Sequence, residues 1–360
     1  MTASASPAIN LHDYEALARE RLDPAAFAYI AGGAGDEITL TANRAAWDAI
    51  GLVPRVLRDV GTVDASVECF GRRWAHPVWM APMAWQRMVH PNGEAASALA
   101  AAAQGAGFVL AEQSGVSIEE IGKLVCDEPG RGPLALQIRL HHDRGFSLAL
   151  TQRAREAGFD AIMLTLDSVS NGARDRERRA GFAPPPDVTP VNLAHLPPPP
   201  PDAPPHPAMT WRDLDWLLGA CRLPVVVKGV LHPADAKQAA TAGVAAIVVS
   251  NHGGRTLDTV IATARALPRI ADAVGGMTPL LVDGGIRRGT DVLKALALGA
   301  RAVLVGRPLY FALAAAGPLG VAQALRLLRD ELEMALVLSG CTTLRDAGPD
   351  LLAELPGQRG

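Results

Sequence analysis

The stretch Val225-Val-Val-Lys-Gly-Val-Leu-His-Pro-Ala-Asp-Ala-Lys-Gln-Ala-Ala-Thr-Ala-Gly-Val-Ala-Ala-Ile-Val-Val-Ser250 decides the fold. Two short aliphatic runs, Val225–Lys228 and Ala246–Ser250, flank an alanine-rich segment with helical spacing, Pro233–Thr241. Buried strands that alternate with amphipathic helices are typical of a parallel sheet built from βα units. The stretch is therefore predicted to fold as strand, helix, strand.

The same alternation continues on both sides of this stretch. Further aliphatic runs predicted to be strands are Val78–Ala81, Phe108–Ala111, Leu134–Ile138, Ala161–Leu166, Leu280–Asp283 and Ala302–Val305. Helical patterns follow most of them, at Gly93–Gln104, Ser147–Ala157, Thr263–Ala273, Gly289–Leu298 and Gly320–Leu338. Eight such units predict an α/β fold, a closed (β/α)8 TIM barrel, with the functional site at the carboxyl ends of the strands.

The 360 residues are predicted to form one domain with additions to the barrel. Residues 1–76 would be an N-terminal helical cap, with helices near Leu11–Arg21 and Thr39–Ala49, residues 77–340 the barrel, and residues 341–360 a C-terminal tail. Prolines crowd residues 182–208, between the fourth and fifth strands, and exclude a helix or an interior strand there. This segment is interpreted as a disordered insertion, as a mobile lid over the barrel mouth, or as both.

Composition excludes several classes of protein. The 34 Lys and Arg against 37 Asp and Glu give a net charge of −3, so nucleic acid is not an expected partner. The four cysteines are far apart and form no CxxC pair, which argues against a disulfide framework and a metal site. Residues 1–10 lack a basic segment followed by an apolar one, and no apolar run is long enough to span a bilayer. A cytoplasmic protein without membrane attachment is predicted.

The strongest functional motif is Ser250-Asn-His-Gly-Gly-Arg-Thr-Leu-Asp258, directly after a predicted strand. His252 could take a proton near neutral pH, and Arg255 could hold a carboxylate through two charge-assisted hydrogen bonds. An isolated histidine is more often structural, but the placement of this one after a barrel strand and beside Arg255 favours catalysis.

Glycines and arginines follow the last two predicted strands, in Leu281-Val-Asp-Gly-Gly-Ile-Arg-Arg288 and Gly299-Ala-Arg-Ala-Val-Leu-Val-Gly-Arg307. Glycines let a backbone approach a phosphate closely, and these loops form the usual phosphate site of the barrel fold. Taken alone, each of the two segments could instead be an ordinary structural turn without a phosphate ligand. Lys228 ends an apolar strand, where its ammonium needs an anionic partner; a Schiff base or an internal salt bridge is the alternative.

In this order, these motifs resemble those of the FMN-dependent α-hydroxy-acid oxidases and dehydrogenases. The resemblance runs from about Asp13 to Ala347 and is densest in Val225–Gly317; Met80-Ala-Pro-Met-Ala84, His90-Pro-Asn-Gly-Glu94, Gln137 and Thr165-Leu-Asp167 also match family positions. It implies FMN as cofactor and oxidation of a small 2-hydroxy acid to the 2-oxo acid. It also implies reoxidation by dioxygen or another acceptor, and a homo-oligomer, either a tetramer or an octamer.

The resemblance carries over residue by residue. FMN would be bound by Ala81, Pro82, Met83, Ala84, Gln137, Thr165, Lys228, Ser250, Asp283, Gly284, Gly285, Arg287, Gly306 and Arg307. His252 would take the substrate hydroxyl proton as hydrogen leaves Cα for flavin N5, and Asp167 would stabilise the cationic imidazole. Arg255 and Arg174 would grip the substrate carboxylate, Tyr29 would donate a hydrogen bond to it, and Lys228 would stabilise the reduced flavin. Several arginines in Ser168–Arg179 could exchange places with Arg174.

The chain departs from the family pattern near the substrate. Ile138-Arg139 stands where the family usually has Leu-Tyr, Ala111 and Gln113 stand where a serine and an aromatic residue are common, and Met83 replaces a small residue. Arg139 would therefore contact the substrate in place of a phenol. With Glu112 and Gln113 beside it, the pocket is predicted to be more polar, so we hypothesise a substrate with a second polar or anionic group.

Two further functions fit parts of the sequence. A tailoring enzyme could keep the barrel and the flavin but oxidise a larger biosynthetic, carrier-bound or peptide substrate. A phosphate-binding barrel without redox activity would need only the glycine and arginine loops, and the presence of His252 and Arg255 speaks against it.

Overall fold

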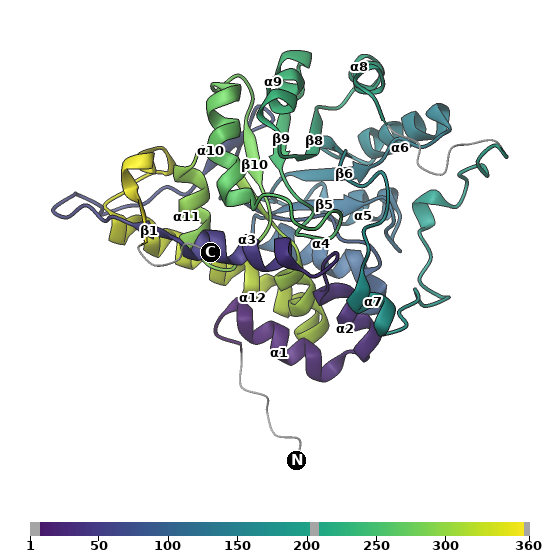
Figure 1. Ribbon diagram of the computed structural model, residues 1–360, viewed down its shortest axis with the longest axis horizontal. Helices are drawn as coiled ribbons and strands as arrows, with labels where there is room; N and C mark the ends of the chain where they lie inside the picture. Colours follow the sequence, from purple (N-terminus) through teal and green to yellow (C-terminus); the bar gives the residue numbers. More distant parts are fainter. Residues whose placement is uncertain (1–7, 202–208, 356–360) are drawn as a thin grey trace.

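The computed structural model describes residues 8–201 and 209–355. Its centre is a closed barrel of eight parallel strands in the order β10-β11-β4-β5-β6-β7-β8-β9 (Figure 1). The strands are β4 (Val78–Met80), β5 (Gly107–Ala111), β6 (Leu134–Ile138), β7 (Ala161–Thr165), β8 (Val225–Val230), β9 (Ala246–Val249), β10 (Leu280–Val282) and β11 (Ala302–Val305). The predicted TIM barrel is confirmed, and every predicted strand lies within two residues of an observed one.

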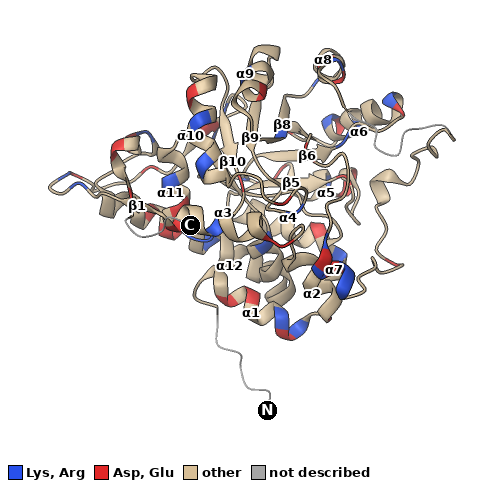
Figure 2. Cartoon of the chain, viewed as in Figure 1, with Lys and Arg blue, Asp and Glu red and all other residues tan. Residues whose placement is uncertain are grey.

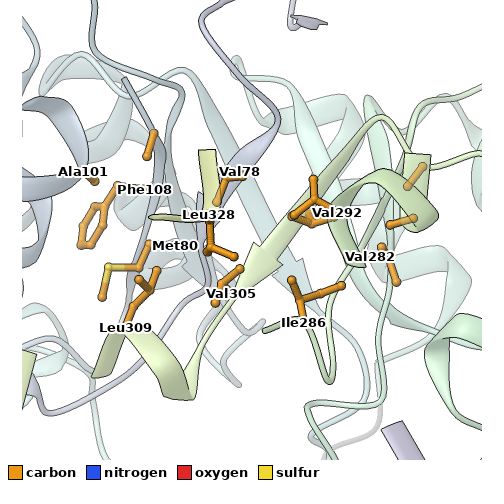
Figure 3. Packing of buried hydrophobic residues seen from close by; sticks show 14 of the residues in the cluster. Val78, Met80, Ala101, Phe108, Val282, Ile286, Val292, Val305, Leu309 and Leu328 are labelled. Atoms are coloured by element: carbon orange, nitrogen blue, oxygen red, sulfur yellow. The ribbon is translucent and has the colours of Figure 1, made fainter. Parts of the chain in front are cut away.

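Two hydrophobic layers stabilise the barrel. Along β4, Trp79 points into the barrel interior, while Val78 and Met80 belong to the outer layer between strands and helices (Figure 3). The Trp79 ring reaches the neighbouring strand, where a Cβ on Gly107 would lie 2.4 Å from Trp79 Cγ. Only glycine fits there, because real Cβ contacts of that length do not occur. The packed interior leaves the strand ends as the place for a site.

Helices surround the barrel. They are α4 (Gly93–Ala103), α5 (Ile118–Val125), α6 (Arg144–Glu156), α8 (Trp211–Ala220), α9 (Pro233–Ala242), α10 (Thr263–Val274), α11 (Gly289–Ala297) and α12 (Arg307–Ser339). Helix α12 is broken at Gly317, just before Pro318, and packs against α1, α4 and α11. By length and mean hydropathy it could cross a membrane, although no unbroken apolar run in its sequence is that long, and half of its most apolar window is buried in the protein.

Three helices precede the barrel: α1 (Leu11–Arg21), α2 (Pro24–Ala31) and α3 (Ile38–Asp48). Helix α1 lies along α12, and α2 lies beside α7 (Asp175–Arg179) at the barrel mouth (Figure 1). The sequence patterns predict α1 and α3 but miss α2. Its signal is present nonetheless, because Asp23 caps the helix by accepting from Ala25 N at 2.8 Å and Pro24 occupies the first turn.

The short elements outside the barrel join distant parts of the chain. In the predicted C-terminal tail, η3 (Leu344–Asp346) and η4 (Pro349–Leu351) lead into β12 (Leu352–Glu354), which pairs antiparallel with β1 (Ile50–Leu52). Strands β2 (Val67–Cys69) and β3 (Arg72–Trp74) form a hairpin, and η1 (Gln86–Met88) follows β4.

The proline-rich segment is attached to the barrel at η2 (Val191–Leu193). The buried Asn192 side chain accepts from Ile118 N at 3.0 Å and donates to Val116 O at 3.1 Å. Residues 202–208 of the predicted lid, residues 1–7 of the cap and residues 356–360 of the tail lie outside the described residues.

Asp258, the last residue of the predicted histidine motif, holds the N-terminal helices to the barrel. Its carboxylate accepts from the backbone N–H groups of Asp36 at 3.0 Å, Ile38 at 3.3 Å and Thr39 at 2.8 Å. Glu37, at the N-cap position of α3, makes no side-chain cap of its own. The loop after β9 therefore supplies the cap for α3.

Replacing Asp258 with alanine is expected to lower the free energy of unfolding by about 1–2 kcal/mol, because the first turn of α3 loses its acceptor. Asp258→Asn keeps an amide oxygen for these N–H groups and is expected to retain most of the stability. Urea unfolding followed by circular dichroism measures both. An alanine variant as stable as the parent would show that the contact does not hold α3.

Candidate active site

A cavity of about 550 Å³ opens at the carboxyl ends of the barrel strands. Most of the predicted site residues line it, namely Tyr29, Ala81, Pro82, Met83, Ala84, Gln137, Arg139, Thr165, Arg174, Lys228, His252, Arg255, Asp283, Gly284, Gly285, Arg287, Gly306 and Arg307. Asp167 and Ser250 do not line the cavity, but each lies one hydrogen bond behind a residue that does. The structure therefore brings the whole predicted set together.

His252 follows β9 in a left-handed backbone conformation, with φ 57°. Its backbone N–H donates to Ser250 Oγ at 3.1 Å, and Gly253 and Gly254 continue with positive φ angles. A Cβ on Gly253 would lie 2.8 Å from Arg307 Nη1, so this tight turn requires glycine. A left-handed histidine is uncommon and costs energy, which the surrounding contacts offset.

The imidazole is oriented by a carboxylate. His252 Nδ1 lies 3.0 Å from Asp167 Oδ1, and the histidine side chain is 32% exposed, on the cavity side. Burial raises the pKa of Asp167, but His252 and Lys228 outweigh this and lower it, so Asp167 is ionised at neutral pH. An ionised Asp167 accepts from Nδ1–H, which leaves the lone pair on Nε2.

The charge state of His252 suits a base. Burial and the nearby Lys228 ammonium lower its pKa, while Asp167 opposes the shift without cancelling it. The imidazole is therefore neutral at pH 7 and can accept a proton. Once protonated, it is stabilised by the adjacent carboxylate.

Behind the cavity, Lys228, Ser250 and Asp283 form a buried chain. Lys228 Nζ donates to Ser250 Oγ at 2.9 Å and lies 3.2 Å from Asp283 Oδ2, to which Ser250 also donates at 2.9 Å. Burial alone would lower the pKa of Lys228, but Asp283 and Asp167 raise it, so the amine is charged and unsuited to a Schiff base. The internal salt bridge is present, and Lys228 still lines the cavity.

Arg287 and Arg307 form a cationic end of the cavity. Arg307 donates to the carbonyls of Ile30 at 3.1 Å, Gly253 at 2.9 Å and Gly32 at 2.8 Å, and Arg287 donates to its neighbour Ile286 at 3.0 Å. Within residues 8–201 and 209–355, neither guanidinium has a carboxylate within 4.0 Å.

Burial lowers the pKa of both arginines, and repulsion from Arg255 and Arg287 adds to the shift at Arg307. Gly306, beside them, precedes α12 and has no side chain that could cap the helix, so the backbone can approach an anion closely there. Charges buried in this way need an anionic partner.

Tyr29, Arg174 and Arg255 form another side of the cavity. The Arg255 guanidinium lies 4.9 Å above the centre of the Tyr29 ring and donates to Tyr29 O at 2.6 Å. Arg174 lies 3.4 Å from Glu177 on α7, a helix that carries charged side chains of both signs (Figure 2). Two guanidinium groups share this one close carboxylate, which leaves positive charge for a small acid.

Arg139 is paired rather than free. Its Nε donates to Glu112 Oε1 at 2.9 Å and its backbone N–H donates to Glu112 Oε2 at 3.0 Å. His141 Nε2 contacts the same Oε2 at 3.0 Å. The sequence reasoning treats Glu112 and Arg139 as independent polar groups, whereas in the structure they form one ion pair.

Some cavity residues have no role in the sequence-based predictions. Trp85 and Phe182 line the cavity, where Phe182 stacks on Tyr29 with ring centres 4.4 Å apart. Tyr310 also lines it and donates to Ala84 O at 2.9 Å. In the sequence, Trp85 directly follows the predicted Ala81–Ala84 loop, and Phe182 begins the proline-rich segment. These positions next to predicted site segments are the signals that could have placed both side chains at the cavity.

Across the described part of the chain, no group of three histidine, cysteine, aspartate or glutamate side chains could hold a metal ion.

Comparisons with known proteins agree on one family. Residues 18–354 match the family described as FMN-dependent dehydrogenase. The chain is 44% identical to L-lactate oxidase from Nostoc sp., over 98% of this chain and 100% of that protein. It is 42% identical to glycolate oxidase 1 from Zea mays, over 94% of this chain and 93% of that protein. A crystal structure of mandelate oxidase with (S)-2-phenylpropionate superposes with TM-score 0.89 and 42% identity, covering 96% of this chain and 98% of that one.

The cavity residues fit a flavin mononucleotide. Arg287 and Arg307 line the same end of the cavity and could hold a phosphate dianion, which Gly306 would let approach the backbone closely. Asp283 Oδ1 is buried without a hydrogen-bond partner in the described structure, so it can accept from a ribityl hydroxyl. Lys228 supplies a fixed positive charge between these groups and His252.

Proposed function

Because the chain belongs to the FMN-dependent dehydrogenase family, as its match over residues 18–354 shows, we propose that it oxidises α-hydroxy acids to 2-oxo acids. The observation that carries this proposal is the neutral His252, oriented by Asp167, in one cavity with Arg287 and Arg307, which have no carboxylate within 4.0 Å among the described residues. Relatives over nearly the whole length are named for oxidising small hydroxy acids, which does not favour a larger carrier-bound substrate.

The cofactor phosphate would be held by Arg287, Arg307 and Gly306, and the ribityl chain by Asp283. Lys228 would place its charge near the ring system. The ring system would be lined by Ala81–Ala84, Gln137 and Thr165. When bound, FMN accepts the two electrons of the oxidation and passes them to dioxygen or another acceptor.

The remaining residues act on the substrate. Arg255 and Arg174 bind its carboxylate, with Tyr29 beside them, and so fix the position of the neighbouring carbon. His252 Nε2 takes the hydroxyl proton as the C–H bond of that carbon breaks, which leaves a C=O double bond. Asp167 stabilises the imidazolium that forms, 3.0 Å away.

The purified protein, loaded with FMN, is expected to be yellow and to lose its visible flavin absorbance when lactate, glycolate, mandelate or a hydroxy dicarboxylate is added without oxygen. Readmitted air should restore the colour if dioxygen is the acceptor. A protein that takes up no FMN, or that no 2-hydroxy acid bleaches, would contradict the proposed function. The homo-oligomer and the cytoplasmic location stay predictions.

A further inference from the structure

Two polar side chains on the cavity wall have no part in this chemistry: Gln113 and Arg139. Strands β5 and β6 are neighbours, and Ala111 is the register partner of Gln137. Gln113 and Arg139 each follow that pair by two residues, and both line the cavity beyond the strand ends. The Arg174 and Arg255 guanidinium groups enter from the loops after β7 and β9 instead.

Glu112 fixes the direction of the Arg139 guanidinium. The carboxylate is 1% exposed and accepts both the Nε–H and the backbone N–H of Arg139. The Arg139 side chain is 35% exposed. Since its Nε edge faces the buried carboxylate and its terminal Nη atoms make no hydrogen bond with the described residues, the Nη edge faces the cavity.

The Glu112 carboxylate is charged and holds the guanidinium in place, so the cavity meets a row of oriented N–H donors here. Burial raises the pKa of Glu112, but His141 and Arg139 outweigh this and lower it, so the carboxylate is charged. Its single charge is shared between Arg139 and His141, and its oxygens are occupied by three donors. An apolar substrate group placed against the Nη edge would leave those donors without partners, which is costly.

We propose that Arg139, with the Gln113 amide of the same cavity, binds a second carboxylate at the end of the substrate side chain. The preferred substrates are then 2-hydroxy dicarboxylates, held at one end by Arg255 and Arg174 and at the other by Arg139. This inference rests on the proposed function, because it names the substrate class of the same site.

The experiment compares 2-hydroxyglutarate with 2-hydroxypentanoate, which has a similar chain without the second carboxylate. The FMN-loaded parent should favour the dicarboxylate in kcat/KM. Arg139→Met should lower kcat/KM for 2-hydroxyglutarate by about 30- to 100-fold, the loss of charge-assisted hydrogen bonds, and leave 2-hydroxypentanoate within about threefold. Calorimetric binding of 2-oxoglutarate should weaken in parallel, while that of 2-oxopentanoate should not.

Matched variants separate binding from charge and stability. Arg178→Met removes another arginine of the same cavity, 71% exposed on α7, and should affect both acids equally. Arg139→Met leaves the buried Glu112 carboxylate without its main partner. The double variant Arg139→Met/Glu112→Gln therefore removes both charges, and it should show the same selective loss of kcat/KM for 2-hydroxyglutarate. Arg139→Lys should keep part of the preference for the dicarboxylate.

Equal losses for both acids in Arg139→Met and in the double variant, or a parent that favours 2-hydroxypentanoate, would overturn the inference and leave the proposed function intact. A parent that no 2-hydroxy acid bleaches would overturn both.

Discussion

Replacing His252 with asparagine is expected to leave FMN bound and to slow its reduction by substrate about 1,000-fold or more, because the proton acceptor is lost. Asparagine tolerates the left-handed backbone at this position better than most residues, so the fold is retained. Anaerobic stopped-flow measurement of flavin absorbance gives the rate, and the ratio of visible to ultraviolet absorbance gives the FMN content. Reduction at the parent rate would remove His252 from the role of base.

The pH dependence of the unmodified enzyme tests the role of His252 as a base in a second way. Since the pKa of His252 lies below its usual 6.5, kcat/KM should be flat near neutral pH and fall only at more acidic pH, as the imidazole becomes protonated. The asparagine variant should lack this acidic limb. His232→Asn is the control: His232 caps α9 through its ring, asparagine is an equally good cap, and both rate and profile should be unchanged.

Arg287→Met is expected to weaken FMN binding about 100-fold or more, because a charge-assisted contact with the phosphate is lost. The same change should leave the melting temperature of the FMN-free protein unchanged or raise it. Burial lowers the pKa of Arg287, so its charge destabilises the folded chain while no anion is present. Thermal unfolding with and without FMN measures both effects, since a ligand stabilises in proportion to the logarithm of its affinity.

The neighbouring Arg288 is the control for Arg287. It lies 2.7 Å from Glu331 and does not line the cavity. Arg288→Met should bind FMN as the parent does and lose only a small part of its stability, as is usual for a partly exposed ion pair. If Arg287→Met bound FMN with the parent affinity, the phosphate site would have to be placed elsewhere.

The barrel could be predicted because each βα unit carries its own local signal. Aliphatic runs such as Val225–Lys228 lie between segments with helical spacing, and eight of them leave few alternatives. Short elements carry no such signal: β1 and β12 have three residues each, and they pair only because segments far apart in the sequence meet. The cap that Asp258 makes on α3 is also a contact between distant segments, which local patterns cannot show.

The site could be predicted as far as its residues lie in recognisable motifs at strand ends. His252, Arg255 and Arg287 are of this kind. The pairing of Arg139 with Glu112 depends on the register between β5 and β6, and the stacking of Phe182 on Tyr29 depends on the path of a proline-rich segment. Neither follows from periodicity, so the sequence gives the residue types at these places without their partners.

The pairing of β4 with β11 has a consequence for how the protein is made. These strands are the first and the last of the barrel to leave the ribosome, and their contact, Trp79 beside Leu304, closes it. The cofactor loops after β10 and β11 are synthesised late, and they meet the loop after β4 only on closure. Contacts between such distant segments form slowly. We therefore expect the complete cavity to form only after the last strand has been synthesised.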